Sequence, residues 1–172
     1  MKILSKQRNS RMCMICGLDN EYGVNAPFYN MEDGSVMTVF RYKEQHQSYP
    51  GRVHGGMITA MLDEMGLRSL WAKELSEETF GVTISLDTKY RKPVPYETEL
   101  IGRGVVVKNT SHFIITDSYI MDKDGEILAN GRIKYIKMDT QTIQEGVEVH
   151  EEMPYLVEDG RTEIEGPFFD NL

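Results

Sequence analysis

The spacing of apolar and polar residues predicts a hairpin, then one long helix, then four more strands. Residues 35–42 alternate between two faces, and the Asp33-Gly34 dipeptide before them is typical of a tight turn back to residues 28–31. Residues 55–75 are apolar on nearly every side over their first half, which is typical of a buried helix. Further strands are predicted at 80–90, 97–108, 111–121 and 126–138.

This order of elements predicts an α+β fold. Consecutive strands with short connections pair as an antiparallel sheet, and an apolar helix must be covered by that sheet. We therefore expect five or six antiparallel strands wrapped around one long buried helix. The folded domain is expected to span residues 26–138, with an irregular polar segment at 1–25 and a weakly ordered acidic extension at 139–172.

The net charge of −8 lies almost entirely in the C-terminal extension. From Asp139 onward there are ten acidic residues and one basic residue, so this segment carries −9 and residues 1–138 carry +1. The body of the protein can therefore hold a locally basic site for an anionic ligand. The chain has no basic stripe with interleaved aromatic residues, which argues against nucleic-acid binding.

The sequence predicts a cytoplasmic protein without a membrane partner. No apolar run approaches the roughly 20 residues that a membrane-spanning helix needs. Residues 1–12 include basic side chains but are not followed by an apolar stretch, unlike a secretory signal.

Cys13 and Cys16 form a Cys-x-x-Cys pair that suits half of a zinc site. A structural zinc site uses four ligands, and the nearest histidines, His46 and His54, lie about 30 residues further on. In a reducing cytoplasm, two reduced thiols beside a turn are the better interpretation. We expect neither a metal nor a cofactor.

The stretch His54-Gly55-Gly56 opens the predicted helix. Glycines let a ligand approach the backbone closely, and the free amides of a helix N-terminus favour negative charge. The stretch could therefore form an oxyanion hole for a carbonyl under attack. The alternative is a glycine turn that only starts the helix.

Asp63 lies inside the apolar half of this helix, where an unpaired carboxylate costs several kcal/mol. Its neighbours on the same helix face are mostly small, which predicts open space above the carboxylate. These neighbours are Gly56, Thr59, Gly66 and Leu67. The alternative is a structural aspartate satisfied by a nearby hydroxyl or amide. Glu64 is expected to pair with Arg68 and to be structural.

Helix geometry separates the two candidate groups. Gly56 and Asp63 are about 10 Å apart along the axis at roughly 1.5 Å per residue, too far to act on one carbonyl carbon. If they cooperate, each site takes its glycine amide from one subunit and its carboxylate from another. A two-fold homodimer with antiparallel helices would form two such sites, and a homotetramer built as a dimer of dimers is the larger alternative.

The spacing Gly51-x-x-His54-Gly55-Gly56, followed by six residues and Asp63, resembles the signature of the hotdog-fold acyl-CoA thioesterases, in the phenylacetate-pathway and THEM-like branch. The similarity covers roughly residues 13–138. Further matching stretches are Gly81-Val82-Thr83, Tyr90-x-x-Pro93-Val94 and Asp124-Gly125-x-x-x-Ala129-x-Gly131.

This resemblance implies a hotdog domain that hydrolyses an acyl-CoA thioester to a free acid and CoA. It implies that Asp63 is the general base or nucleophile and that Thr83 orients the attacking water. It places Gly55 at the carbonyl-binding position, with His54 supporting the loop. In relatives the two halves of the site come from different subunits.

The chain departs from the family pattern at one position. Many relatives carry an asparagine six residues before the histidine, where it helps to hold the thioester. Here Ser48 stands there, beside Gln47, and either side chain could take the role of the asparagine. For the CoA phosphates, Arg91 and Lys92 are the candidate cations, and a solvated strand end is the alternative.

Two other functions on the same fold remain open from the sequence. A non-catalytic acyl-CoA-binding or sensing domain would keep the pocket but would not need a carboxylate beside the carbonyl. A hydratase would need a catalytic histidine, for which His54 is the one plausible candidate. Release of free thiol from a panel of acyl-CoAs would distinguish them.

Overall fold

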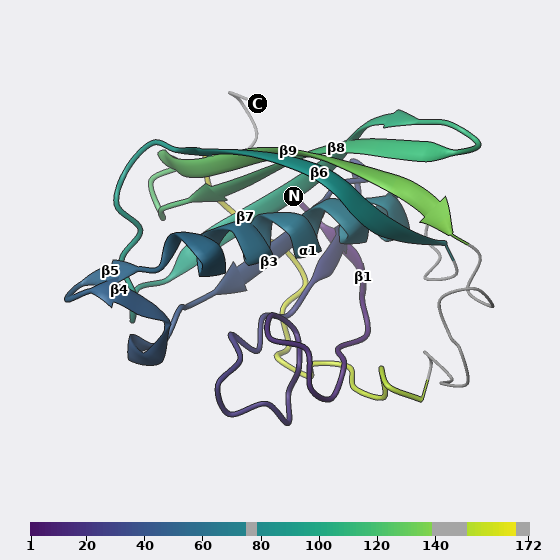
Figure 1. Ribbon diagram of the computed structural model, residues 1–172. Helices are drawn as coiled ribbons and strands as arrows, with labels where there is room; N and C mark the ends of the chain where they lie inside the picture. Colours follow the sequence, from purple (N-terminus) through teal and green to yellow (C-terminus); the bar gives the residue numbers. More distant parts are fainter. Residues whose placement is uncertain (75–78, 139–150, 168–172) are drawn as a thin grey trace.

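The computed structural model describes residues 1–74, 79–138 and 151–167. One long helix, α1 (Gly55–Glu74), runs along a large antiparallel sheet (Figure 1). The strands are β1 (Ile3–Lys6), β2 (Tyr29–Met31), β3 (Val36–Phe40), β4 (Gln47–Tyr49), β5 (Arg52–Val53), β6 (Phe80–Tyr90), β7 (Leu100–Asn109), β8 (Phe113–Met121) and β9 (Ile127–Met138). A short 3-10 turn occupies Glu44–His46.

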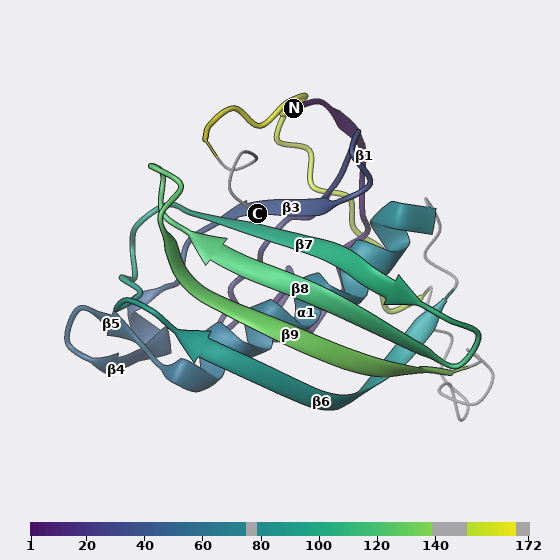
Figure 2. The same ribbon diagram turned by 90° about the horizontal axis from the view of Figure 1, so that it is seen from above.

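Seven strands form the main sheet, in the order β1-β2-β3-β7-β8-β9-β6. The sheet curves over α1, which lies beneath β7, β8, β9 and β6 when the molecule is seen from above (Figure 2). This arrangement confirms the α+β hotdog fold. The predicted number of five or six strands was too low. The missed strand, β1, lies in the segment predicted to be irregular, where it pairs with β2 over only four residues, too few to show a periodic pattern.

Residues 151–167 of the C-terminal tail pack against the rest of the protein. Met153 and Ile164 are buried, and isolated bridges join Asn9 to Tyr155 and Lys2 to Glu163. Because both partners of each bridge come from opposite ends of the chain, neither end shows this packing in its own pattern. The part of the predicted weakly ordered extension that the structure describes is therefore packed against the N-terminal segment, whereas residues 139–150 and 168–172 lie outside the described residues.

Two further contacts of the acidic tail strengthen this attachment. The Lys6 ammonium pairs with Asp159 at 2.5 Å, and the Tyr29 hydroxyl donates to the same carboxylate. These hydrogen bonds hold the pKa of Asp159 down at about 2, although its partial burial acts in the opposite direction. At least one acidic group of the tail is thus a structural contact.

Helix and sheet approach each other unusually closely at two glycines. A Cβ added to Gly66 of α1 would lie 2.2 Å from the Tyr135 hydroxyl oxygen and 2.6 Å from Thr116 Oγ1. A Cβ added to Gly104 of β7 would lie 2.5 Å from the backbone oxygen of Met65. Glycine is required at both positions because any side chain would push the helix off the sheet.

No helix among the described residues is long and apolar enough to cross a membrane.

Replacing Gly104 with alanine tests this close packing. The new methyl group meets backbone rather than a flexible side chain. We therefore expect the free energy of unfolding to fall by about 1–3 kcal/mol and the melting temperature to fall by several degrees. Gly131→Ala in β9 is the matched control, because its Cβ would meet side-chain and backbone atoms at 3.5 Å or more, an ordinary contact distance. Equal melting temperatures for the two variants would contradict the close-packing argument.

Candidate active site

The start of α1 is shaped by His54. Its ring Nδ1 accepts the Gly56 amide N–H at 2.9 Å, and its backbone oxygen accepts the Met57 amide at 3.0 Å. A side-chain acceptor at this position caps the helix, as serine or aspartate does elsewhere. Because Gly56 already donates to His54, it is unavailable to a substrate. Among the described residues, the Gly55 amide has no acceptor, so Gly55 is the donor that remains of the predicted pair.

A cavity of about 450 Å³ opens beside Gly55 and gathers most of the residues predicted to bind substrate. Ser48, Arg91 and Lys92 line it. Gln47 is exposed on β4 and is not among the lining residues. Of the two residues considered in place of the usual asparagine, the structure brings Ser48 alone to this cavity.

Arg52 adds a third cation to the same cavity, and the sequence analysis did not select it. Lys92 is paired with Glu126, and Arg91 donates to a side-chain amide oxygen on β9 at 2.6 Å. Arg52 forms no ion pair with any residue that the structure describes. Its position in the sequence could have predicted this, because a basic residue two positions before His54 must lie near the start of the helix.

Asp63 lies on α1 beneath β6, beside a separate cavity of about 230 Å³. The Thr83 hydroxyl, on β6, donates to the two carboxylate oxygens at 2.9 and 3.2 Å. The Tyr135 hydroxyl, on β9, donates to the backbone oxygen of Asp63 at 2.7 Å. The sheet therefore holds both the backbone and the side chain of this residue, and one face of the carboxylate still meets the cavity.

Burial raises the pKa of Asp63, and the hydrogen bond from Thr83 opposes this rise. Since the folded-state pKa is raised, folding favours the protonated carboxyl group. The stability that this group contributes is fully present below its unfolded-state pKa and is lost as pH rises through the folded-state pKa. Above that pKa, the ionised carboxylate lowers the stability of the folded state, and such unfavourable ionisable groups are typical of functional sites.

The neighbours of Asp63 do not create open space in the way that the sequence suggested. Gly66 is small because Tyr135 and Thr116 press against it. Gly56 faces the His54 ring, with a Cβ position 3.0 Å from Nδ1. The expectation that small helix neighbours leave room above the carboxylate was therefore wrong, and the room comes from the cavity toward Ile15, Ala60 and Leu67.

Glu64 is a structural residue, as its spacing predicted. Its carboxylate accepts the Arg68 Nε–H at 2.7 Å, four residues further along α1. Arg68 lies in the second half of the helix, where its sequence is more polar, yet Arg68 is only 1% exposed. Its guanidinium also donates to Gln7 at 3.1 Å and lies 4.3 Å from the centre of the Phe28 ring. Local sequence could not show this burial, because residues from the N-terminal segment cover the side chain.

The glycine half and the carboxylate half form two separate cavities in one chain. The cavity beside Gly55 and the cavity beside Asp63 have no lining residue in common. This agrees with the separation calculated from helix geometry. A single chain therefore presents two half-sites rather than one complete constellation.

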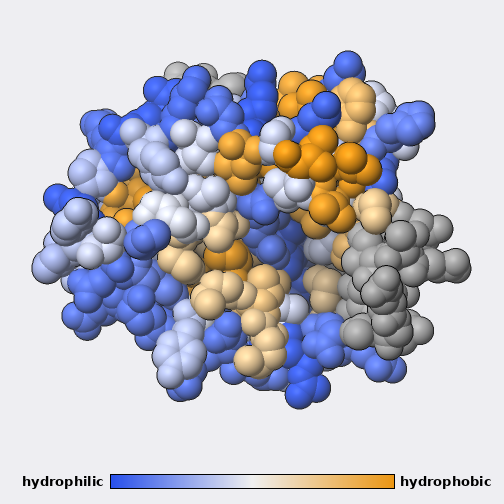
Figure 3. Space-filling view, in the orientation of Figure 1, coloured by the Kyte–Doolittle hydropathy of each residue, from blue (hydrophilic) through white to orange (hydrophobic). Residues whose placement is uncertain are grey.

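β6 forms one edge of the sheet, and no other strand among residues 1–74, 79–138 and 151–167 pairs with its outer side; apolar side chains are exposed on it. β6 is the last strand of the sheet, and Val82 and Ile84 on it are each 47% exposed. Apolar side chains gather on the face of the molecule that β6 crosses (Figure 3). Thr83, which holds Asp63, lies between these two residues, so the carboxylate half-site adjoins this edge.

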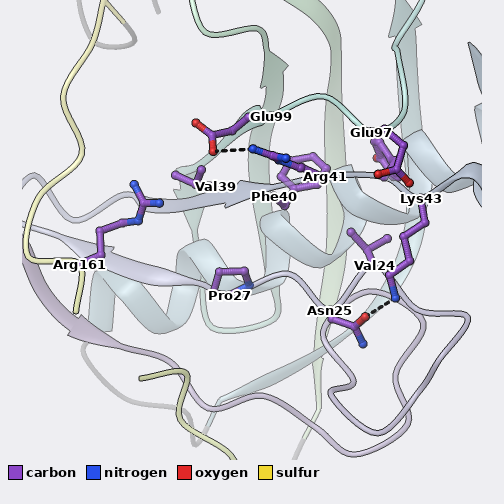
Figure 4. A pocket seen from close by; sticks show the side chains of 11 residues that line it. Val24, Asn25, Pro27, Val39, Phe40, Arg41, Lys43, Glu97, Glu99 and Arg161 are labelled. Carbon is purple, nitrogen blue, oxygen red and sulfur yellow. Dashed lines mark hydrogen bonds and ion pairs between the residues drawn. The ribbon is translucent and has the colours of Figure 1, made fainter. Parts of the chain in front are cut away.

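Another cavity, of about 330 Å³, lies between β3, the N-terminal segment and the tail (Figure 4). Its lining holds three cations and two carboxylates: Arg41 pairs with Glu99 at 3.7 Å, and Lys43 donates to Asn25. No residue predicted for the active site lines it. We therefore do not assign it to the active site.

Residues 50–129 match the family described as the Thioesterase superfamily. This match spans 80 of the chain's 172 residues, and over it the chain is similar to that superfamily and has the hotdog fold of its solved structures. The acyl-coenzyme A thioesterase THEM4 of Rattus norvegicus is 25% identical to it over 137 residues, which cover 79% of this chain and 56% of that protein. This chain therefore spans little more than half the length of this relative.

Solved structures of the superfamily share the fold. A thioesterase superfamily protein of 26% sequence identity superposes with a TM-score of 0.65, over 73% of this chain and 63% of that chain. A hypothetical thioesterase from Streptococcus pneumoniae, whose crystal structure contains coenzyme A, superposes with a TM-score of 0.57 at 20% identity, over 67% of this chain and 87% of that chain.

Proposed function

We propose that this protein hydrolyses an acyl-CoA thioester to a free acid and CoA. The observation that carries the proposal is the Asp63 carboxylate, which is half-buried, held by Thr83, free of any cationic partner among the described residues, and open to a cavity. A raised pKa and an open face suit a group that accepts a proton or attacks a carbonyl carbon. The similarity of residues 50–129 to the Thioesterase superfamily agrees with this chemistry.

Two routes are compatible with this carboxylate. Asp63 takes a proton from a water molecule that attacks the thioester carbon, and Thr83 fixes the orientation of carboxylate and water. Alternatively, Asp63 attacks the carbon itself, and water then hydrolyses the resulting anhydride. In both routes the carbonyl oxygen gains negative charge, which the Gly55 amide at the start of α1 would stabilise, and CoA leaves as a thiolate.

The complete site is proposed to form between two chains. Pairing of two copies across the open β6 edges would cover Val82 and Ile84 and set the two α1 helices antiparallel. Asp63 of one copy would then approach Gly55 of the other. We propose a homodimer on this basis, with a dimer of dimers as a larger assembly; the cytoplasmic location stays a prediction.

The cations beside Gly55 are proposed to bind the phosphates of CoA. Arg52, Arg91 and Lys92 all line the cavity that contains the Gly55 amide. A phosphate there would compete with Glu126 for Lys92 and would give Arg52 an anionic partner. The presence of CoA in the crystal structure of the Streptococcus pneumoniae neighbour makes CoA the natural ligand to test.

Asp63→Asn tests the catalytic assignment. The amide keeps the size and the hydrogen bond from Thr83 but cannot act as base or nucleophile, so kcat for acyl-CoA hydrolysis should fall by at least ~10²-fold. The melting temperature at neutral pH should stay equal or rise, because a buried amide costs less than a buried charge. CoA should still bind, as seen by calorimetry.

Glu64→Gln is the matched control on the same helix. Removing the charge that faces buried Arg68 should lower stability by about 1.5–3 kcal/mol and leave kcat within a few-fold of wild type. Near wild-type turnover in Asp63→Asn would overturn the assignment and leave a non-catalytic acyl-CoA-binding domain as the better interpretation.

Ile84→Lys tests the split site. A lysine at the β6 edge should repel a second copy, so light scattering should show a monomer and hydrolysis should fall by ~10²-fold or more although the circular dichroism spectrum is unchanged. Val107→Lys serves as control, because Val107 is equally exposed at 50% but lies on β7 inside the sheet. A monomer with full activity would rule out the two-chain site.

Neutralising the cations beside Gly55 tests CoA binding. The double variant Arg91→Gln/Lys92→Gln and the single variant Arg52→Gln should each raise KM by about tenfold and leave kcat nearly unchanged, as expected when uniform binding is lost. Added salt should reproduce part of this effect in wild type. Lys108→Gln, at the opposite end of the sheet, should have no effect. An unchanged KM in both cavity variants would reject this phosphate site.

A further inference from the structure

The Cys13–Cys16 pair lies outside the groups assigned to hydrolysis, yet it adjoins the Asp63 half-site. Both thiols pack against α1 at Glu64, and their sulfur atoms and a Glu64 carboxylate oxygen all lie within 4.8 Å of one another. Ile15, between the two cysteines, lines the Asp63 cavity. A change at this pair is thus in direct contact with the wall of the candidate active site.

A tight turn fixes the distance between the two sulfur atoms. The Gly17 amide donates to the Cys13 backbone oxygen at 2.9 Å, which closes one turn around the pair. A Cβ at Gly17 would lie 2.5 Å from the backbone nitrogen of Cys13, so only glycine allows the turn to be this tight. Cysteines three residues apart on a helical turn bring their Cα atoms within the range that a disulfide spans.

The two thiols differ sharply in their surroundings. Cys13 is partly exposed, and its sulfur accepts the Ile15 amide N–H at 3.3 Å. A hydrogen bond from the Cys16 thiol lowers the pKa of Cys13 to about 7, against the effects of burial and of Glu64. Cys16 is only 2% exposed, and both its hydrogen bond to Cys13 and its burial raise its pKa.

We propose that Cys13 is a thiol-modification site that reacts with low-molecular-weight disulfides and that Cys16 is its resolving thiol. The Cys13 thiolate attacks one sulfur of the small disulfide, a mixed disulfide forms, and one small thiolate leaves. Cys16 then loses its proton to the departing thiolate and attacks Cys13 Sγ, which forms the Cys13–Cys16 bond and releases the second small thiolate; this thiolate takes up from water the proton that Cys13 had lost on ionisation. The two protein thiols are oxidised and the small disulfide is reduced to two thiols.

A metal ion explains the cluster less well. Glu64 and the two cysteines make three side chains, whereas a structural zinc site has four ligands. The Glu64 carboxylate is already held by buried Arg68 at 2.7 Å. The guanidinium of Arg68 also places a positive charge beside the Cys16 sulfur, which disfavours a bound cation.

Intact mass measurement of the full-length protein tests the proposal. Wild type incubated with excess oxidised glutathione at neutral pH should lose two hydrogen masses and gain no adduct. Cys16→Ser should keep one glutathionyl group, because no resolving thiol is present. Cys13→Ser should stay unmodified under the same conditions, because Cys16 is buried.

Peptide mapping of wild type after brief alkylation provides a test without any variant: Cys13 should be labelled at least ~10-fold faster than Cys16. Equal labelling, a wild type that stays a dithiol, a Cys13→Ser variant that becomes modified, or one tightly bound zinc per purified chain would each overturn the proposal. The mass readout does not depend on hydrolysis, so failure here is separate from failure of the thioesterase proposal. If both hold, hydrolysis rates of the dithiol and disulfide forms should differ, since Ile15 lines the Asp63 cavity.

Discussion

The close packing of α1 on the sheet is the constraint on which the candidate site depends. Gly66 and Gly104 have no side chains, and a side chain at either position would keep the helix and the strands apart. The gap is then small enough for Tyr135 to donate to the backbone of Asp63 and for Thr83 to reach its carboxylate. A helix displaced by the width of one methyl group would break both hydrogen bonds. The same contact that stabilises the fold therefore positions the carboxylate.

A buried charge connects the helix to the N-terminal segment. Arg68 is enclosed by Gln7, Phe28 and Glu64, and an arginine in this position must be paired because an unpaired buried charge is very unfavourable. The N-terminal segment is thus part of the folded unit. It places Cys13 against Glu64, the residue that follows Asp63 on α1. Structural pairing and the proposed thiol site occupy adjacent positions on one helix face.

The separation of the two half-sites follows from the rigidity of a single helix. Gly55 begins α1 and Asp63 lies two turns later, and no local rearrangement can bring them to one carbonyl carbon. The apolar β6 edge beside the carboxylate half-site is the surface across which a second copy is proposed to complete the site. In this interpretation, the β6 edge joins the two copies and, by doing so, completes the active site.

The sequence by itself determined the elements and the position of the candidate carboxylate. Period-two alternation and one apolar helix predicted six of the seven strands of the main sheet, α1 and the α+β class, because these patterns depend on residues close together in the chain; the two short strands β4 and β5 were not predicted. Asp63, the His54-Gly55 helix start and the Glu64–Arg68 spacing were visible for the same reason.

Only the tertiary structure decided which groups are available. It showed that His54 occupies the Gly56 amide, that Tyr135 rather than empty space explains Gly66, and that Arg52 joins the Gly55 cavity. It also showed that the two ends of the chain pair with each other. The Tyr135–Gly66 contact and the pairing of the chain ends join residues far apart in sequence, and a contact of that kind leaves no periodic trace in either partner. His54 and Arg52 are close in sequence to the helix start, but the directions of their side chains are set by the folded loop and not by residue spacing.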